Sequence, residues 1–492
     1  MFLDRIITQT HIDLEKRKQA HPLETVIQLA HTQPEPRDLF AALQAGPGVR
    51  LIAEVKRASP SKGMLALHMN PVELARTYET YGAAAISVLT EPHFFLGSPE
   101  YLTAIKQAVS VPVLRKDFII DEYQVYEARA WGADAILLIC AILDDAQLHH
   151  LLSIAHQLSM HCLVEVHSAV EAQRAVAAGA MIIGVNSRDL VTFQMNPYLI
   201  RKLRQLIPAD RVIVAESGIH SEADARSLAR YDVQAMLVGE SLVVSDNVPD
   251  QMHTLLRGTN ESTQIKICGL RTPEALQVAI DAGADMLGFI FYKPSHRYIA
   301  PEQVSALLAT AENSHNLGNG GRDKSVITPD RVGVFVNEEA DFINEVVEQA
   351  DLDFVQLHGH ESPEFCLRIH RPVIKAISLR SEEDRRKVNE YKQVAWRILL
   401  DTPTVQWGGT GMTHDWELAR NIAQKIPILL AGGLTPENVA EAIQHVSPWG
   451  LDVSSGVETN KHKDSNKIRA FIENVRKTGR IKTGERQLFA QS

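Results

Sequence analysis

The chain has 492 residues, which is more than one hydrophobic core usually serves, so two domains are expected. With 45% hydrophobic and 22% charged residues it has a globular composition, and no apolar run approaches the roughly 18 residues of a membrane helix. The net charge of −10 argues against a nucleic-acid partner, and the four cysteines have no metal-type spacing. The first residues lack a signal peptide's apolar core, so we expect a cytoplasmic protein without membrane contact.

Eight short apolar runs, each followed by a stretch of helical periodicity, occupy the first half of the chain. Residues 1–45 precede them and have a helical pattern. Alternation of this kind predicts parallel strands with helical crossovers. The expected strands are 51–56, 83–89, 111–116, 133–139, 162–166, 181–186, 211–217 and 235–240.

The second half repeats this pattern with eight more runs. Eight strands alternating with helices in about 250 residues are typical of a closed β/α barrel. An open doubly wound sheet is disfavoured because no glycine-rich dinucleotide fingerprint follows a first strand. The predicted fold is therefore α/β, with two tandem (β/α)8 TIM barrels and a helical extension before the first. The expected strands are 265–269, 286–291, 331–336, 354–359, 373–378, 397–402, 427–433 and 451–456.

A polar stretch, RGTNESTQ, separates the two halves. We expect domains at 1–258 and 265–492, joined by a linker at 259–264. A second Gly/Asn-rich stretch, 313–330, is expected to form a mobile loop within the second barrel, and no chemistry is assigned to it.

Charged residues end three strands of the first half. Alternation along a strand places Glu54 and Lys56 on one face, and it likewise turns Lys116 and Glu165 toward the barrel mouth. Two lysines and two glutamates in one cavity perturb each other's pKa values and suit acid/base chemistry. The alternative interpretation is a structural ion-pair network.

Gly/Ser turns follow the seventh and eighth strands of the first half, at 217–218 and 239–241. Backbone N–H groups at such turns commonly bind phosphate, although a Ser-Gly pair can also be ordinary turn chemistry.

Polar strand ends also occur in the second half. Lys266 and Cys268 point into the predicted mouth, Asp401 ends the sixth strand, and His358 lies beside the mouth with Gln356 beneath it. A lone cysteine in an apolar strand is more often buried filler, but the other polar strand ends favour a catalytic base. Glycine- and serine-rich loops at 407–411, 431–434 and 452–458 offer a second phosphate site.

The first half resembles the indole-3-glycerol-phosphate synthase family over nearly all of residues 1–258. The resemblance implies that carboxyphenylamino-deoxyribulose phosphate closes to a ring, loses carbon dioxide and then water, and gives indole-3-glycerol phosphate. It is carried by AEVKRASPSKG (53–63), SVLTEPHFFLGS (87–98), RKDFIID (115–121), LVEVH (163–167), GVNSRDL (184–190), AESGI (215–219) and VGES (238–241).

This resemblance assigns roles to the candidate residues. Lys116 would be the general acid for ring closure, and Glu165 would assist dehydration by proton transfer. Lys56 would contact the substrate carboxylate or share the acid role, with Glu54 holding it in position. The remaining implied contacts are Asn186 and Arg188 for hydroxyl and carboxylate groups, Phe118 with Phe94 or Phe95 for the anthranilate ring, and Ser59, Ser217, Gly218, Gly239 and Ser241 for the phosphate.

The second half resembles the phosphoribosylanthranilate isomerase family over about residues 264–478. The resemblance implies an Amadori rearrangement in which Asp401 protonates the furanose oxygen and Cys268 removes the sugar C2 proton. Arg297 would pair with the anthranilate carboxylate. The motifs are KICGL, FYKPSHRYI (291–299), VGVFVN, VQLHG, LLDT, GGTG, AGGL and LDVSSGVE.

The two resemblances support each other because the isomerase makes the substrate that the synthase consumes. The alternatives are that one barrel is a non-catalytic phosphate-binding or stabilising module, or that the chain is a metal-dependent aldolase or epimerase. We expect phosphorylated small-molecule substrates, no metal, no organic cofactor, and a monomer. The remaining implied contacts of the isomerase are Gln356 and His358 for substrate, and Gly409, Gly411, Gly432, Gly433, Ser454 and Ser455 for phosphate.

Overall fold

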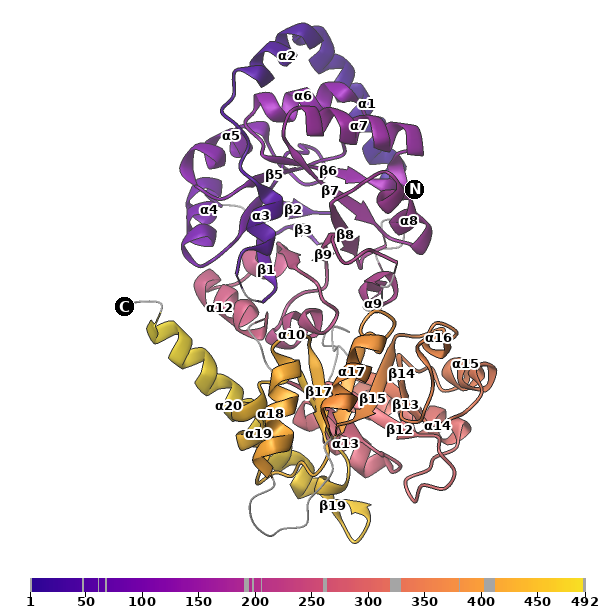
Figure 1. Ribbon diagram of the computed structural model, residues 1–492. Coiled ribbons are helices and arrows are strands. Elements are labelled where there is room, and N and C mark those ends of the chain that lie inside the picture. The colour runs from indigo at the N-terminus through magenta and orange to yellow at the C-terminus, as the bar shows by residue number, and fades with distance from the viewer. Residues whose placement is uncertain are drawn as a thin grey trace. The chain divides into compact units, whose positions relative to one another are not determined.

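The computed structural model divides the chain into two compact units, Met1–Asn260 and Glu261–Ser492 (Figure 1). The structure describes residues 2–46, 48–60, 62–66, 69–189, 194–196, 199–204, 206–259, 263–318, 329–379, 381–401 and 412–489. Within these ranges, only the backbone is described at 311–318, 382, 412–415 and 479–489.

The first unit is built on a closed barrel of parallel strands in the order β1-β10-β9-β8-β7-β6-β5-β4. Inward residues of these strands form an apolar core with Ile52, Leu114 and Leu163, on which the charged strand ends lie. All eight predicted strands are confirmed within two residues at each end. They are β1 Arg50–Val55, β4 Ala85–Leu89, β5 Val113–Lys116, β6 Ala135–Ile139, β7 His161–Val166, β8 Ile182–Asn186, β9 Val212–Glu216 and β10 Ala235–Val238.

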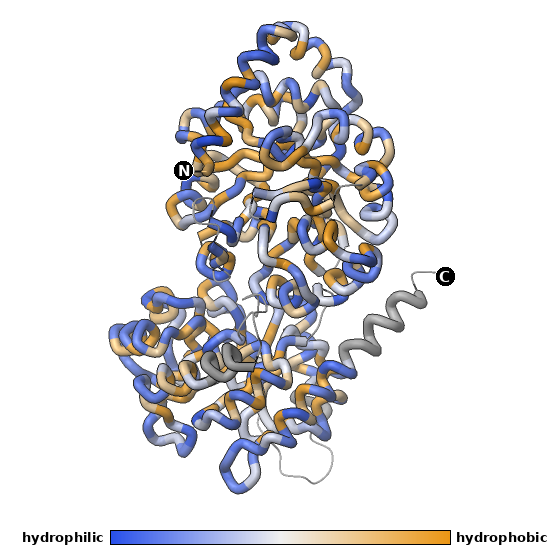
Figure 2. The backbone as a smooth tube through the Cα atoms, turned by 180° about the vertical axis from the view of Figure 1, so that it is seen from behind, coloured by the Kyte–Doolittle hydropathy of each residue, from blue (hydrophilic) through white to orange (hydrophobic). Residues whose placement is uncertain are grey.

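Helices cover the outside of this barrel and begin at polar caps. Asn70 and Ser98 cap helices that start with proline, and Asp144 forms a capping box with Gln147. Figure 2 shows hydrophobic segments gathered on the inner strands of this unit. The helices are α4 Pro71–Thr80, α5 Pro99–Ala108, α6 Glu122–Ala130, η1 Cys140–Ile142, α7 Asp145–Gln157, α8 Ala169–Ala177, α9 Leu199–Arg204, α10 Glu222–Arg230, α11 Glu240–Val243 and α12 Val248–Thr259.

The predicted helical extension is confirmed as α1 Phe2–Ala20, α2 Leu23–His31 and α3 Leu39–Gln44. It is attached to α6, because Arg17 Nε lies 2.8 Å from Glu127 Oε1 and the Tyr123 hydroxyl donates to the Arg17 carbonyl at 3.1 Å. A short hairpin, β2 Ala58–Ser59 and β3 Gly63–Met64, follows β1.

The second unit is a closed barrel in which each parallel strand pairs with the next and β18 pairs with β11. Outward residues such as Ile265, Ile267 and Leu287 pack on the helices. All eight predicted strands of this half are confirmed. They are β11 Gln264–Cys268, β12 Met286–Ile290, β13 Asp330–Phe335, β14 Phe354–Leu357, β15 Val373–Ser378, β16 Arg397–Asp401, β17 Ile428–Ala431 and β18 Gly450–Val453.

Helices again alternate with these strands, and a small hairpin, β19 Glu458–Thr459 and β20 His462–Lys463, follows the last of them. The elements are α13 Pro273–Ala282, α14 Pro301–Gly318, α15 Ala340–Gln349, α16 Pro363–Cys366, α17 Glu382–Tyr391, α18 Met412–Ala423, α19 Val439–Val446, η2 Ser455–Val457 and α20 Ser465–Phe489.

Two connecting segments differ from the expected pattern. The linker was expected at 259–264, but its first residue, Thr259, belongs to the end of α12 and its last, Gln264, begins β11. The prediction of a loop over 313–330 is wrong at both ends, since α14 continues through Gly318 and β13 begins at Asp330, while 319–328 lie outside the described residues. The run from Pro301 carries enough helix-forming residues to continue the helix into the Gly/Asn-rich stretch.

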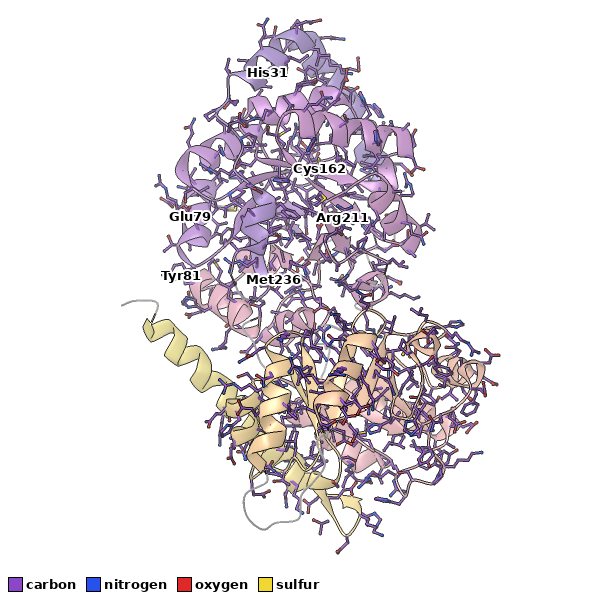
Figure 3. The ribbon with its side chains drawn as sticks, in the orientation of Figure 1. His31, Glu79, Tyr81, Cys162, Arg211 and Met236 are labelled. Atoms are coloured by element: carbon purple, nitrogen blue, oxygen red, sulfur yellow. The ribbon has the colours of Figure 1, made fainter. Side chains whose placement is uncertain are left out.

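The four cysteines are free thiols buried in the fold; Figure 3 labels Cys162, on β7 of the first unit. Among the helices that the structure describes, none is long and apolar enough to cross a membrane.

Candidate active sites

A cavity of about 170 Å³ opens at the carboxyl ends of the strands of the first barrel. All four charged residues predicted for this mouth line it, so the strand alternation read from the sequence is confirmed. Its polar lining is Glu54, Lys56, Ser59, Lys116, Asp117, Glu165, Asn186, Arg188, Glu216, Ser217, His220, Glu240 and Ser241.

Lys116 is the centre of the charge cluster in this cavity. Its Nζ lies 2.7 Å from Glu216 Oε2 and 3.3 Å from Glu165 Oε2. Lys56 Nζ lies 2.7 Å from Glu54 Oε1. Each lysine therefore lies against carboxylates that are themselves almost fully buried.

Glu216 is a site residue that the sequence analysis missed. It ends β9 on the same face as Val212 and Val214, so the alternation that identified Glu165 would also have found it. The strand beside it carries Gly184, where an added Cβ would lie only 2.1 Å from Glu216 Oε1. A side chain at position 184 would exclude the Glu216 carboxylate from its observed place.

The cluster sets the ionisation of its own members. Burial disfavours the Lys116 charge, but Glu216, Glu165 and Glu54 outweigh burial and raise its pKa. Burial likewise opposes the charges of Glu54 and Glu165, yet the neighbouring cations lower both pKa values. For Glu216 burial prevails, helped by the charge of Glu165, and its pKa is raised. The cavity thus places an ionised and a readily protonated carboxyl on the two sides of one ammonium group.

The residues expected to bind phosphate lie together at one side of the cavity. Ser217 and Gly218, which follow β9, both adopt left-handed backbone angles, with φ of +68° and +75°. Gly239 and Ser241 follow β10, and an added Cβ at Gly239 would lie 2.4 Å from Glu54 Oε1. The two turns approach the charged cluster closely because glycine leaves that space open. Ser59, on β2, lines the same cavity.

The aromatic wall of the cavity shows which of the two expected phenylalanines, Phe94 or Phe95, faces it. Phe95 lines the cavity with Phe118, their ring centroids 6.2 Å apart, whereas Phe94 packs edge-on against Phe2. Of the two alternatives, Phe95 therefore forms the wall. Asn186 Oδ1 accepts a hydrogen bond from the Arg188 backbone N–H at 3.0 Å.

In the second barrel, Lys266 and Cys268 lie on the inward face of β11, as expected. Lys266 is fully buried and its Nζ lies 3.0 Å from Asp452 Oδ1 on β18. Burial raises the pKa of the Cys268 thiol, and the nearby lysines, Lys266 and Lys463, offset this only in part. The thiol is therefore protonated in the free enzyme at neutral pH.

Arg297 lines a second cavity, of about 210 Å³, whose charged lining residues are mostly basic. Its guanidinium is held by Glu458 in a bidentate pair, with Nε at 2.7 Å from Oε1 and Nη2 at 2.8 Å from Oε2. Lys463 Nζ contacts the same carboxylate at 2.9 Å and the Ser454 carbonyl at 2.8 Å. The sequence analysis did not name Glu458 or Lys463 as site residues, although Glu458 is the last residue of the DVSSGVE motif.

Asp401 and His358 border a separate cavity of about 620 Å³. His358 Nε2 lies 3.6 Å from Asp401 Oδ2, and its Nδ1 lies 3.0 Å from Gln356 Nε2. Within the described part of the chain, Cys268 is not among the residues lining this cavity. The structure therefore places Cys268 and Asp401 at ends of different strands of one barrel but not in one described pocket.

The expected phosphate residues of this barrel follow β17 and β18. Gly432 and Gly433 have φ of +89° and +63°, and the Ser454 hydroxyl donates to the Cys268 carbonyl at 3.1 Å. Ser455 begins η2, directly after Ser454. The remaining two, Gly409 and Gly411, lie in 402–411, outside the described residues.

A buried ion pair supports the segment that carries His358. Lys375 Nζ lies 2.9 Å from Glu361 Oε2 and donates to the Gly359 carbonyl at 2.8 Å. Glu361 in turn accepts hydrogen bonds from the backbone N–H groups of Asn337 and Gly359. Both side chains are nearly inaccessible to solvent, so neither charge has water as an alternative partner.

We expect Lys375→Met to lower the free energy of unfolding of the second unit by about 3–5 kcal/mol, because it leaves the Glu361 charge buried without its cation. Urea unfolding followed by tryptophan fluorescence measures the change. The matched double variant Lys375→Met/Glu361→Gln should recover much of the loss. A double variant no more stable than the single one would contradict this account.

Among the described residues, no group of three or more His, Cys, Asp or Glu side chains is arranged to hold a metal ion. Each barrel carries lysine, carboxyl or thiol groups at its strand ends, and such groups can donate and accept protons.

Two family models match the chain. Residues 3–255 match indole-3-glycerol phosphate synthase, and residues 265–474 match N-(5'-phosphoribosyl)anthranilate isomerase. A tryptophan biosynthesis protein TrpCF of Haemophilus influenzae is 36% identical over 96% of this chain and 96% of its own length. A multifunctional tryptophan biosynthesis protein of Phycomyces blakesleeanus is 36% identical over 96% of this chain and 69% of its own length. The solved phosphoribosylanthranilate isomerase of Thermotoga maritima is 39% identical over 43% of this chain and 98% of its own, with a TM-score of 0.37.

The chain belongs to the indole-3-glycerol-phosphate synthase family in its first barrel and to the phosphoribosylanthranilate isomerase family in its second. It is a bifunctional enzyme of tryptophan biosynthesis. The second barrel isomerises N-(5-phosphoribosyl)anthranilate to 1-(2-carboxyphenylamino)-1-deoxyribulose 5-phosphate, and the first converts that product to indole-3-glycerol phosphate. A non-catalytic role for either barrel is not favoured.

Proposed function

We propose that Lys116 is the acid of the synthase reaction. The observation that supports it is the position of its Nζ between Glu165 and Glu216, 3.3 and 2.7 Å away. In the proposed first step the ammonium group donates to the substrate ketone oxygen while the anthranilate ring carbon that bears the carboxylate attacks the ketone carbon. Carbon dioxide then leaves that ring carbon, and its bonding electrons restore the ring system.

Loss of water completes the synthase reaction. The new hydroxyl takes a proton from the ammonium group of Lys56 or of reprotonated Lys116 and leaves as water, while Glu165, the ionised carboxylate of the cluster, accepts the proton of the adjacent ring carbon and a carbon–carbon double bond forms. Lys56, paired with Glu54 at 2.7 Å, is placed to meet the substrate carboxylate or share the acid role. Asn186 and Arg188 bind substrate oxygens. Phe95 and Phe118 cover the anthranilate ring, and Ser59, Ser217, Gly218, Gly239 and Ser241 hold the phosphate.

For the second barrel we propose Asp401 as acid and Cys268 as base. Asp401 protonates the furanose oxygen, the C1–O bond breaks, and a Schiff base forms. The Cys268 thiolate then removes the C2 proton to give an enolamine, which tautomerises to the ketone. Arg297 meets the anthranilate carboxylate, Gln356 and His358 contact substrate, and Gly409, Gly411, Gly432, Gly433, Ser454 and Ser455 hold the phosphate.

The pH dependence of the isomerase follows from the buried thiol. Because burial raises the pKa of Cys268, only a small fraction is thiolate at neutral pH. The scheme also needs Asp401 in its protonated form, which decreases with pH as the thiolate increases, so we expect kcat/KM for phosphoribosylanthranilate to change by less than about threefold between pH 6.5 and pH 8. The fluorescence decrease of the substrate measures it. A profile that rises or falls about tenfold per pH unit over this range would contradict the pairing of Asp401 as acid with Cys268 as base.

We further propose that the enzyme is a cytoplasmic monomer without a nucleic-acid partner. Its thiols are all free, as in a reducing compartment, and the net charge of −10 is unfavourable for polyanions. The test of the whole scheme is formation of fluorescent indole-3-glycerol phosphate when the purified chain receives phosphoribosylanthranilate alone. A chain that stops at the carboxyphenylamino intermediate would overturn the synthase scheme, and one that leaves the substrate unchanged would overturn the isomerase scheme.

A further inference from the structure

His167 is a buried histidine beside the synthase cluster, with no role in the scheme above. It follows β7 two residues after Glu165, and its side chain is 11% exposed. Its Nε2 lies 3.3 Å from Glu165 Oε1, and its Nδ1 lies 3.4 Å from Glu171 Oε2 on α8. The imidazole thus lies between a carboxylate of the cavity and one of the surrounding helix.

Glu171 is fixed independently of this contact. Its carboxylate accepts hydrogen bonds from the His167 backbone N–H at 2.9 Å and from the Ser168 hydroxyl at 3.1 Å. Ser168 also caps α8. The outer carboxylate is therefore held by the start of a helix, which gives the imidazole a rigid support.

The groups around Glu165 divide between its two oxygens. Oε1 faces His167, while Oε2 faces Lys116 from β5, and Asn186 of β8 also hydrogen-bonds the carboxylate. Glu216 of β9 competes for Lys116 at the shorter distance of 2.7 Å.

Arg174, on the same helix as Glu171, is directed away from His167, toward Asp145 and the Cys140 carbonyl. Although burial opposes its charge, Glu165 and Glu171 raise the pKa of His167 to about 10, so the imidazolium persists at neutral pH.

We propose that His167 is a positioning residue of the synthase, whose imidazolium bridges Glu165 to Glu171 and holds the Glu165 carboxylate ionised and directed at Lys116. Lys116 alone faces two carboxyls that compete for one cation, and like charges so close together cannot both stay ionised at low cost. The second cation at Glu165 decides which of the two carries the proton, namely Glu216. The proposal rests on the role of Glu165 as proton acceptor.

The charge-removing variant His167→Gln tests it in the full-length enzyme, supplied directly with the carboxyphenylamino substrate. Without the cation Glu165 binds a proton more readily, so we expect the acid limb of the kcat–pH profile to move up by about one pH unit. On that limb, below the pH at which the wild type keeps half of its activity, kcat should fall by about tenfold, while at pH 7.5 kcat and KM should each change by less than about twofold. His167→Lys, which restores a cation, should return the limb toward that of the wild type.

The matched control is His161→Gln, at the opposite end of β7, where the imidazole pairs with Asp38 on the surface at 2.9 Å. It should leave the profile unchanged. Glu171→Gln weakens the outer support and should give a smaller shift in the same direction as His167→Gln.

Three results would overturn the proposal. They are an unmoved acid limb in His167→Gln, a fall in kcat that His167→Lys does not repair, and an equal shift in His161→Gln. A Glu165→Gln variant identifies failure of the underlying scheme, because full synthase activity in that variant would refute the role of Glu165 itself.

Discussion

Lys116→Ala should abolish formation of indole-3-glycerol phosphate while the isomerase step continues. The variant loses the proposed acid and the cation against which Glu165 and Glu216 are arranged. General acid catalysis accounts for about 10²–10⁴-fold in rate, and we expect a loss of kcat near the upper end because the acid and the local electrostatics fail together. Supplied with phosphoribosylanthranilate, the variant should accumulate the carboxyphenylamino intermediate, which chromatography detects.

The isomerase in the same chain provides the internal control for this variant, and Lys16→Ala, at a lysine 68% exposed on α1, provides the matched control. Residual synthase activity within about tenfold of wild type would be far too high for loss of the acid, and would assign that role to Lys56 instead.

Cys268→Ala should have the opposite effect on the two activities: loss of the isomerase step with the synthase retained. Removing the proposed base should lower isomerase kcat by about 10²–10⁴-fold, with the synthase fully active when given its own substrate. The substitution removes only one sulfur atom from a buried site, and Lys266 keeps its Asp452 partner at 3.0 Å, so the barrel should remain folded. Loss of phosphoribosylanthranilate fluorescence measures the isomerase.

Cys366→Ala is the matched control, because that thiol is also buried in the second unit but lies on α16, away from the strand ends. If isomerase activity survives in Cys268→Ala, the thiol is not the base. Cys268 is then a buried core residue without a chemical role, which is the alternative that the sequence left open.

Strand positions and inward-facing side chains were predictable from the sequence because a barrel strand has a period of two and a buried face. The sequence alone therefore places Glu54, Lys56, Lys116 and Glu165 at one barrel mouth. Glu216 follows the same alternation along its strand. It was missed because the sequence analysis considered only the Ser-Gly turn that follows this strand as a phosphate site.

Other features of the sites depend on approach in three dimensions and leave no periodic signal. Glu458 pairs with Arg297 across 161 positions of sequence, and no local pattern predicts that partner. Phe94 and Phe95 are neighbours in sequence whose backbone N–H groups both donate to the Glu91 carboxylate, and no local pattern shows which of the two rings lines the cavity. The sequence analysis ended this helix too early, at 313. Glycine and asparagine favour loops, but the helix-forming residues before them continue α14 through Gly318.

The first residues of the chain take part in the synthase cavity. Phe2, Leu3 and Ile6 of α1 line it, alongside the side chains that we propose perform the chemistry. Any affinity tag or fusion partner attached ahead of Phe2 is therefore tethered beside this cavity. Purification handles and reporter domains are better placed elsewhere, so that the measured kinetics describe the enzyme and not its handle.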